Sequence, residues 1–213
     1  MIILFVTMTC TLCHTKLQSL ADEFYFICDT CGAYVKSSQH YLSREEEKER
    51  YLNHENDVND VHYQKFTSPI TDAIFENQQK SHLGLDFGCG TGPIISKQLI
   101  DSDFQVILYD PFFAPNETYK DNRYDYIFSC EVFEHFHHPK QEIETLLSLL
   151  KPKGRLYIMT HIFNHQEDFE TWYYRNDPTH VFIYTKKTMR YIASTYQLEP
   201  EVLSERLVIL KKS

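Results

Sequence analysis

The chain has 213 residues, of which 42% are hydrophobic and 24% are charged. This balance is typical of a globular protein and excludes a collagen-like or wholly disordered chain. The 21 basic and 30 acidic side chains give a formal net charge of −9, which disfavours a general nucleic-acid binder because such proteins present a basic face. No apolar run approaches the roughly 18 residues that a membrane-spanning helix needs, so we expect no membrane partner.

The first six residues are apolar, but the run is short and no basic residues precede it. A secretory signal needs both a basic start and a longer apolar stretch. We therefore expect a cytoplasmic protein, in which thiols stay reduced. The alternative that the chain starts at Met8, with residues 1–7 as an extension, stays open.

Four of the six cysteines lie in residues 1–37, as the pairs Cys10-x-x-Cys13 and Cys28-x-x-Cys31. Two such pairs can place four thiolates around one tetrahedral Zn²⁺ ion. The pattern resembles a zinc ribbon, and we predict a zinc-ribbon module over residues 1–37. Because four thiolates leave no open coordination position, this zinc is expected to be structural and not catalytic.

Two other interpretations of this segment are weaker. Cys10-x-x-Cys13-His14 matches the haem-attachment pattern, but the second cysteine pair favours zinc. A redox-active cysteine pair is expected beside a strand–helix–strand unit and not in a separate cysteine-bearing turn. Zinc ribbons often bind nucleic acid. Residues 1–37, however, carry two lysines and three acidic residues, so they have no net positive charge to attract phosphates. The partner of the ribbon stays unknown.

Residues 38–82 are polar and have helical patterns, and we assign them to a preamble between two domains. Ser43 and Glu46 form a capping-box pattern at the start of a helix, and the charged run 45–50 that follows is typical of a solvated helix face. Ser68-Pro69 predicts a second helix with Pro69 at its first position, where the missing N–H costs nothing.

Residues 83–213 alternate short apolar runs with helical patterns, which predicts a doubly wound, mostly parallel α/β sheet of the Rossmann-like type. Helices are expected to begin near Pro93, Pro139 and Thr185. The expected strands are 83–87, 105–110, 124–130, 155–160, 201–205 and 206–211.

A glycine-rich motif, Leu-Asp-Phe-Gly-Cys-Gly-Thr-Gly-Pro, occupies residues 85–93 between a predicted strand and a predicted helix. Its three glycines alternate, and they let the backbone turn sharply and approach a ligand closely. A dinucleotide fingerprint has its third glycine one residue later, where this chain has Pro93, so an NAD enzyme is disfavoured. The motif resembles motif I of class I S-adenosylmethionine (SAM)-dependent methyltransferases, and the resemblance extends over about 83–213.

The resemblance implies a SAM pocket at the carboxyl ends of the strands, with Asp110 on the ribose hydroxyls. Only 14 residues separate Asp110 from Asp125, so we expect the third-strand region to be shortened. Phe112 and its neighbour are expected either to cover the adenine or to belong to the core, and Tyr63 can also reach the cofactor. The expected cofactor-binding residues are Asp86, Gly88, Cys89, Gly90, Gly92, Asp110, Pro111, Phe112, Ser129 and Glu131.

Two glutamates and a histidine follow the predicted strand 124–130, as Glu131-x-x-Glu134-His135. In one helical turn all three would share a face. With His180, they resemble the two-Glu, two-His metal site of small-RNA 2′-O-methyltransferases, and a similar stretch occurs in ubiquinone-pathway O-methyltransferases. The resemblance implies that Mg²⁺ or Mn²⁺ binds these four residues and activates an acceptor hydroxyl.

Other interpretations of the histidines remain open. His180 could act alone as a general base, or both cluster histidines could be structural, and His161 is another candidate base. The candidate catalytic residues are Glu131, His135, His180 and His161.

We therefore predict a SAM-dependent methyltransferase that methylates the hydroxyl of a small-molecule or sugar-like acceptor, with zinc in its ribbon. One alternative is an RNA or ribosomal-RNA methyltransferase that binds RNA with the ribbon. The net negative charge of the chain disfavours this alternative. Another is a non-catalytic scaffold with a methyltransferase-like fold, which the intact glycine motif disfavours.

Overall fold

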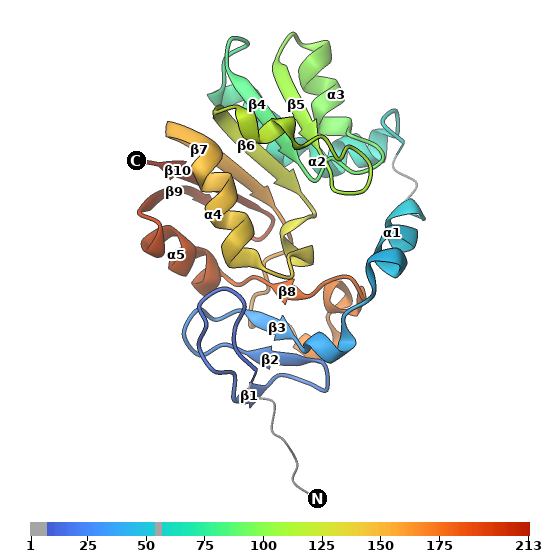
Figure 1. The fold of residues 1–213 in the computed structure, drawn as a ribbon, viewed down its shortest axis with the longest axis vertical. Helices are drawn as coiled ribbons and strands as arrows, with labels where there is room; N and C mark the ends of the chain where they lie inside the picture. The colour runs from blue at the N-terminus through green and yellow to red at the C-terminus, as the bar shows by residue number, and fades with distance from the viewer. Residues whose placement is uncertain (1–7, 54–56) are drawn as a thin grey trace, which may run out of the picture.

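The computed structural model describes residues 8–53 and 57–213; the alternative start at residues 1–7 lies outside this range. A six-stranded sheet in the order β5-β4-β6-β7-β10-β9 forms its centre (Figure 1). The first four strands are parallel, and β10 runs antiparallel to both neighbours. The strands are β4 (Leu83–Phe87), β5 (Gln105–Tyr109), β6 (Tyr124–Cys130), β7 (Leu150–Met159), β9 (Leu198–Leu203) and β10 (Leu207–Lys212).

Helices cover both faces of this sheet, which confirms the predicted α/β class. Side chains alternate along β6, so Tyr126 and Phe128 pack with two helices on one face, while Ile127 packs with two helices on the other. None of the described helices is long and apolar enough to cross a membrane. The helices of the two faces are α2 (Val61–Asn77) and α3 (Ile94–Asp101), then α4 (Pro139–Leu149) and α5 (Lys186–Thr195).

The connection from β5 to β6 contains no strand of the central sheet, as the short spacing predicts. Asp110 forms an isolated bridge with Ala114, and a 3₁₀ turn spans Glu117–Asp121. Tyr119 from this turn is buried against Phe87 and Tyr109. A compact loop therefore replaces a full helix and strand at this edge of the sheet.

The polar preamble contains α1 (Arg44–Leu52) and all of α2. Ser43 caps α1 as predicted: its hydroxyl accepts a hydrogen bond from the Glu46 amide at 3.3 Å, and the Glu46 carboxylate accepts one from the Ser43 amide at 2.8 Å. Both orphan donors at the helix start are thereby satisfied.

The prediction that a helix starts at Pro69 is wrong, because α2 begins at Val61 and contains Pro69. Asp60 caps this helix by accepting a hydrogen bond from the His62 amide at 2.8 Å. An internal proline removes one hydrogen bond and costs about 3 kcal/mol. The full burial of Ile70 and Ile74, which follow the proline, favours continuation of the helix.

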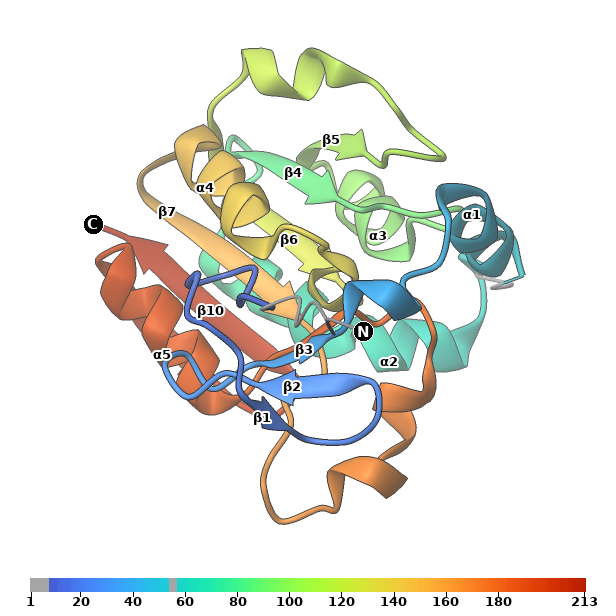
Figure 2. The same ribbon diagram turned by 60° about the horizontal axis from the view of Figure 1, so that its bottom comes forward.

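The cysteine-bearing segment forms a second, antiparallel sheet in the order β1-β2-β3-β8. Its first three strands are β1 (Ser19–Leu20), β2 (Tyr25–Ile27) and β3 (Tyr34–Lys36), and Figure 2 shows them side by side in front of the larger sheet. The fourth strand, β8 (Phe182–Ile183), comes from a distant part of the chain and pairs with β3. The N-terminal segment is thus joined to the rest of the protein by main-chain pairing.

Candidate active site

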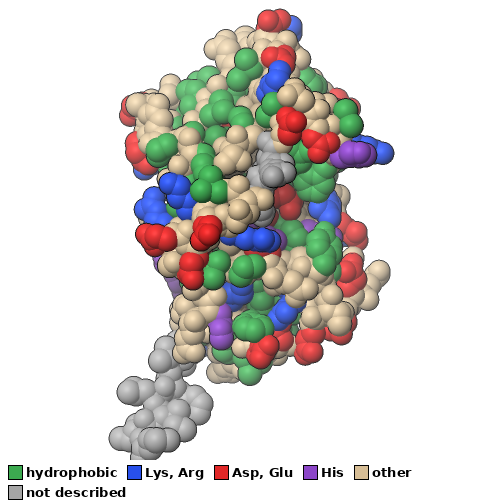
Figure 3. Space-filling view, turned by 90° about the vertical axis from the view of Figure 1, so that its right-hand side faces the viewer, with side chains coloured by type: hydrophobic (Ala, Val, Ile, Leu, Met, Phe, Trp, Pro, Cys, Tyr) green, Lys and Arg blue, Asp and Glu red, His purple; other side chains and the backbone are tan. Residues whose placement is uncertain are grey.

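A cleft of about 1250 Å³ opens beside the carboxyl ends of β4, β5 and β6. In open α/β sheets ligands bind at this edge of the sheet. Figure 3 views the molecule from the side on which α1 lies, and acidic and basic side chains are interspersed on that face. The cleft walls come from α1, from the loops that follow the three strands, and from the segment 173–180.

The glycine turn after β4 forms one wall of the cleft. Gly88 has φ +85° and Gly90 has φ +61°, a backbone region that favours glycine. A Cβ at Gly88 would lie 2.5 Å from Val132, whereas a Cβ at Gly90 would meet no atom within 4 Å. The turn is therefore packed on the Gly88 side and open on the Gly90 side, which lets a ligand approach the backbone.

Asp110, at the end of β5, connects the glycine turn to the next loop. One carboxylate oxygen accepts hydrogen bonds from the amides of Phe112 and Phe113, and the other accepts one from the Gly90 amide at 3.0 Å. Each carboxylate oxygen has about two acceptor positions, so the second oxygen keeps one for a ligand hydroxyl. Asp110 lines the cleft, as its expected ribose contact requires.

The other predicted cofactor residues divide into two groups. Cys89, Pro111, Phe112 and Glu131 line the cleft together with the residues already described. Asp86, Gly92 and Ser129 are not among the lining residues.

Two of the residues outside the cleft lining stabilise the glycine turn from behind. The Asp86 carboxylate accepts a hydrogen bond from the Ser96 hydroxyl at 2.6 Å, and burial raises the pKa of Asp86 to about 7. The Ser129 hydroxyl donates to the Phe87 carbonyl at 2.9 Å. Both residues can therefore shape the cofactor pocket without lining it.

Helix α1 contributes cleft residues that the sequence analysis missed. The guanidinium of Arg44 lies 5.3 Å from the centre of the Phe112 ring, and Arg50 forms an ion pair with Asp177 at 2.7 Å. Tyr51 packs edge-on against His135. The charged run has no buried residue and resembles any solvated helix, so the local sequence carried no signal for this role. Tyr63 of α2 also lines the cleft, in agreement with the suggestion that it can reach the cofactor.

Three of the four predicted metal ligands meet at the inner wall of the cleft. One Glu134 carboxylate oxygen lies 3.9 Å from His135 Nε2 and 4.0 Å from His180 Nε2. One ligand atom from each residue lies within 4.8 Å of the other two. Glu131 is not part of this cluster, because it precedes the 3₁₀ turn Phe133–His135 and has φ +53°. The expected single helical turn is therefore absent from residues 131–135.

Backbone carbonyls fix the tautomers of both histidines. Nδ1 of His180 lies 2.6 Å from the Tyr174 carbonyl, and Nδ1 of His135 lies 3.0 Å from the Thr179 carbonyl. A carbonyl oxygen can only accept, so both Nδ1 atoms must carry the proton. Burial lowers the pKa of His180 to about 4, so its ring is neutral and its Nε2 lone pair is free to bind a cation.

The Glu134 carboxylate is fully buried and accepts hydrogen bonds from the hydroxyls of Thr160, at 2.8 Å, and Tyr174. Within residues 8–53 and 57–213 it forms no ion pair with a lysine or arginine. Burial and the nearby Glu134 raise the pKa of Glu131 to about 8, and one buried Glu131 oxygen has no hydrogen-bond partner among these residues. The buried Glu134 carboxylate therefore has no basic partner in this part of the chain, which favours the binding of a cation beside it.

His161 has a different environment from the cluster histidines. Its Nδ1 lies 3.0 Å from the Tyr173 hydroxyl, and burial, assisted by Arg206, lowers its pKa to about 4. The residue is not among those that line the cleft. The structure therefore does not bring this candidate base to the predicted site.

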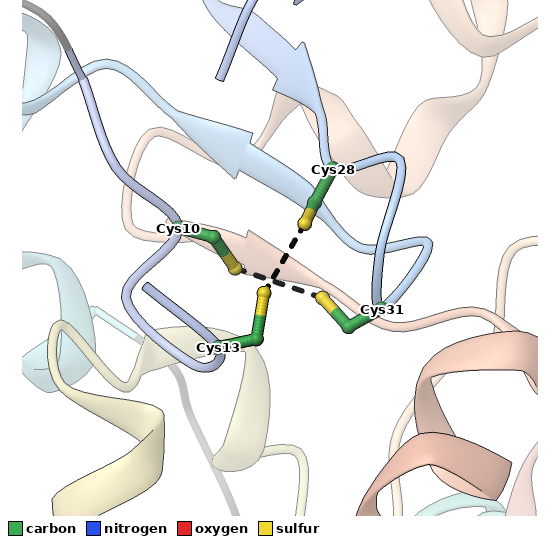
Figure 4. A group of neighbouring side chains, drawn as sticks. All are labelled: Cys10, Cys13, Cys28 and Cys31. Carbon is green, nitrogen blue, oxygen red and sulfur yellow. Dashed lines mark hydrogen bonds between the residues drawn. The ribbon is translucent and has the colours of Figure 1, made fainter. Parts of the chain in front are cut away.

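The four cysteines of the N-terminal segment point toward a common centre (Figure 4). The sulfur atoms of Cys10 and Cys31 are 3.6 Å apart, and those of Cys13 and Cys28 are 3.3 Å apart. A tetrahedral zinc ion with bonds of about 2.3 Å separates its sulfur ligands by about 3.8 Å. All four sulfur atoms lie within 4.8 Å of one another, so this donor set has the dimensions and chemistry of a four-thiolate metal site.

Solved structures with the same fold include several methyltransferases. The 1,6-didemethyltoxoflavin-N1-methyltransferase of Burkholderia thailandensis, solved with S-adenosylhomocysteine (SAH), has 15% identity and a TM-score of 0.59 over 90% of this chain and 100% of its own. Human N-acetylserotonin methyltransferase with SAM has 12% identity and a TM-score of 0.54, covering 80% of this chain and 57% of its own. A methyltransferase of calicheamicin biosynthesis with SAH has 10% identity and a TM-score of 0.52, covering 72% and 55%.

No curated protein sequence matches this chain significantly. A family model described as a methyltransferase domain matches residues 60–203, which include strands β4 to β9, the glycine turn and the Glu134–His135–His180 cluster. The chain therefore belongs to the methyltransferase domain family, and it is a SAM-dependent methyltransferase.

Proposed function

We propose that this enzyme methylates a hydroxyl group of a small-molecule acceptor with the help of a divalent cation. The observation that carries the proposal is the position of the Glu134–His135–His180 cluster. It lines the same cleft as the Gly88–Gly90 turn and Asp110. A methyl donor and a cation-bound acceptor can therefore lie together in one cleft, where positioning accounts for much of the rate.

The cofactor side is assigned to the turn after β4 and the loop after β5. The exposed backbone at Gly90 permits close approach of SAM, and Asp110 retains an acceptor position for a ribose hydroxyl. Phe112 offers an apolar surface for the adenine, with Arg44 over its ring. Glu131, with one unpartnered buried oxygen, is assigned to the methionine end, where a positively charged ammonium would satisfy it.

The acceptor side is assigned to Glu134, His135 and His180, with Mg²⁺ or Mn²⁺ as the cation. Two imidazoles and one carboxylate are a donor set that suits Mn²⁺ at least as well as Mg²⁺. A bound cation supplies Lewis-acid chemistry that lowers the pKa of a hydroxyl. The carbonyls of Tyr174 and Thr179 hold the two rings with Nε2 unprotonated, as metal-ligating histidines require.

A small-molecule acceptor is favoured by the size of the cleft and by the net charge of the chain. Ligand pockets usually measure about 300–1000 Å³, so a cleft of about 1250 Å³ can hold the cofactor together with a second small molecule. Two of the structurally similar proteins, the 1,6-didemethyltoxoflavin methyltransferase and the N-acetylserotonin methyltransferase, act on small molecules. The net charge of −9 disfavours an RNA acceptor.

The four-cysteine site is assigned to structural Zn²⁺. Three of the four cysteines are fully buried, and zinc–thiolate bonding in such segments provides much of their folding energy. The site has four thiolates and no open position, so no step of methyl transfer is assigned to this ion.

Calorimetry and electron paramagnetic resonance with Mn²⁺ test the proposal on the zinc-loaded protein. We expect SAH to bind the wild-type protein, and one Mn²⁺ to bind at micromolar concentration. His180→Gln should abolish Mn²⁺ binding and leave SAH binding within about twofold, because His180 lies outside the cofactor side. His161→Gln is the matched control and should retain both ligands, since His161 does not line the cleft.

The acceptor class is tested with methyl-labelled SAM and mass spectrometry of the products. Phenols, catechols and sugar-like diols are incubated with the Mn²⁺-loaded enzyme, and transfer-RNA and ribosomal-RNA fragments are incubated in parallel. Label on a small-molecule oxygen supports the proposal. Label on RNA alone, or Mn²⁺ binding that survives His180→Gln, overturns it.

A further inference from the structure

The segment 174–183 lies between the candidate active site and the four-cysteine segment. On one side it provides His180 and the two carbonyls that orient the cluster histidines. On the other side it ends in β8, which pairs with β3 through Val35 and Phe182. The same stretch of chain therefore belongs to both structures.

Two side chains from the cysteine-bearing segment hold this stretch by its backbone. The Tyr25 hydroxyl donates to the His180 carbonyl at 2.6 Å, and the Lys36 ammonium donates to the Pro178 carbonyl at 2.7 Å. The Lys36 amide also donates to the Val181 carbonyl at 2.9 Å. These bonds fix the backbone at three positions around the His180 ring.

Both side chains are buried. A module that only bound zinc at the protein surface would not need to bury a tyrosine and a lysine against the rest of the chain. Tyr25 is fully buried and Lys36 is 5% exposed. Burial lowers the pKa of Lys36 to about 8, so keeping its ammonium inside costs free energy. Lysine is almost never fully buried without a partner, and in the described chain this ammonium has the Pro178 carbonyl as its partner.

Arg175 of the segment and two residues that flank it, Phe169 and Thr185, are also attached to the module. Asp22 forms an ion pair with Arg175, and the rings of Tyr34 and Phe169 stack at 4.2 Å. The Thr185 hydroxyl donates to the Gly32 carbonyl at 3.1 Å, directly after the last cysteine of the metal site. The turn that carries Gly32 depends on the cysteine site for its shape, because it contains Cys28 and Cys31 and the Gly32 amide donates to the Cys28 carbonyl at 2.7 Å.

We propose that the four-cysteine module is a positioning platform for the acceptor side of the active site, with Tyr25 and Lys36 as its positioning residues. Through His180 and the Tyr174 and Thr179 carbonyls, the module sets the orientation of the imidazole rings. Among the described residues, no hydrogen bond or ion pair joins the module to the Gly88–Gly90 turn or to Asp110, so we expect the cofactor side to stay intact without it. The inference rests on the proposed function only where it treats the histidines as cation ligands.

The test compares Tyr25→Phe and Lys36→Met with the wild-type protein, all zinc-loaded. Tyr25→Phe removes one hydroxyl and keeps the ring, and Lys36→Met keeps most of the aliphatic chain. Nitrogen-15 NMR of the histidine rings reports the tautomer of His180, whose signal is assigned with His180→Gln. Mn²⁺ affinity, SAH affinity and zinc content are measured on the same samples.

We expect the His180 ring in both variants to lose its pure Nδ1–H signature and become a mixture of tautomers. Mn²⁺ affinity should fall about tenfold, the effect of losing one well-placed buried hydrogen bond. SAH affinity and zinc content should stay unchanged. Tyr196→Phe and Lys80→Met are the matched controls and should behave like the wild type. Tyr196 is partly buried and Lys80 is exposed, and their side chains pair with Glu144 and Asp103, outside the segment.

A wild-type His180 signature and wild-type Mn²⁺ affinity in both variants would overturn the proposal. Equal losses of SAH and Mn²⁺ affinity would also overturn it, because they indicate general destabilisation and not positioning. If the wild-type enzyme binds no Mn²⁺, the cation part of the proposed function fails, while the ring signature still decides whether the module orients His180. If one variant does not fold, the other carries the same test.

Discussion

The two sides of the cleft are built in different ways. The cofactor side comes from two consecutive strand–loop units, in which Asp110 meets the Gly90 amide 20 residues away. The acceptor side combines Glu134 with Thr160, Tyr174 and His180, and the Tyr25 hydroxyl, 155 residues before His180, donates to the His180 carbonyl. A local site can tolerate damage elsewhere in the fold, whereas an assembled site inherits the stability of every part that it joins.

The largest expected effect follows from breaking the cysteine site with Cys28→Ser. Loss of a structural metal belongs to the few changes that cost more than about 4 kcal/mol. We expect catalytic activity to disappear while SAH binding survives. Trp172, the only tryptophan, is buried against Phe163 and Tyr174, so its fluorescence should shift to the red.

Chelation followed by zinc addition is the control for this prediction. Wild-type protein should lose and regain its tryptophan signal, whereas Cys28→Ser should not respond to zinc. Loss of SAH binding together with the tryptophan signal would contradict the proposed independence of the two sides.

Glu134→Gln is expected to have the next largest effect. The change removes the carboxylate and nearly preserves its shape. Thr160 and Tyr174 donate to different carboxylate oxygens, so the amide oxygen keeps one of these hydroxyls as a donor and the amide NH₂ group can donate to the other. We expect the turnover number to fall between about a hundredfold and ten-thousandfold, the range associated with losing activation of an acceptor proton. Steady-state kinetics with saturating SAM measures this loss. Glu144→Gln on the surface of α4 should leave the rate unchanged, and equal rates in both variants would contradict the assignment.

Asp86 gives the cofactor side its own pH dependence. Burial raises its folded-state pKa from 3.8 to about 7. Between these values the folded state keeps a proton that the unfolded state has lost, so the free energy of unfolding falls as the pH rises. The total loss is at most about 4 kcal/mol. In urea titrations at pH 5 and pH 8, Asp86→Asn should lack this contribution and be more stable than the wild type at pH 8.

An exposed carboxylate provides the comparison for this pH effect. Asp101→Asn, on the surface of α3, should keep the pH dependence of the wild type. If Asp86→Asn loses stability equally at both pH values, the carboxylate is ionised in the folded protein and the pH argument fails.

Asp110→Asn is expected to have the smallest effect. Asparagine keeps one oxygen acceptor, so only part of the contact with the turn and the ribose is lost. We expect SAH affinity to fall about tenfold, which corresponds to about 1.4 kcal/mol. Calorimetry should show no change in Mn²⁺ affinity, and a parallel loss of Mn²⁺ would show that the two sides are coupled.

Sequence patterns correctly predicted the features that depend on residues close together in the chain. The cysteine spacing placed four sulfur atoms together, and the capping box at Ser43 marked the start of α1. The short interval after Asp110 predicted the reduced third-strand region, because chain length alone limits what can form there. The spacing of Glu134 and His135, with the resemblance that added His180, brought three cluster residues together correctly.

Features that depend on distant residues escaped prediction. The pairing of β3 with β8 joins short, unremarkable segments, and nothing in either segment indicates its partner. Glu131 leaves the cluster because its backbone adopts φ +53°, which a helical spacing rule does not anticipate. Pro69 lies inside α2 because burial of the neighbouring isoleucines outweighs its local preference.

The late arrival of β8 also has a consequence for synthesis of the protein. Val35 leaves the ribosome 147 residues before its partner Phe182, an interval of about 7–30 seconds at typical elongation rates. Throughout that interval the β3 edge is available to any other strand, a known route to aggregation. The nascent chain can bind zinc once its four cysteines have emerged, but the segment 174–183 can reach its final position only after Phe182 has been synthesised.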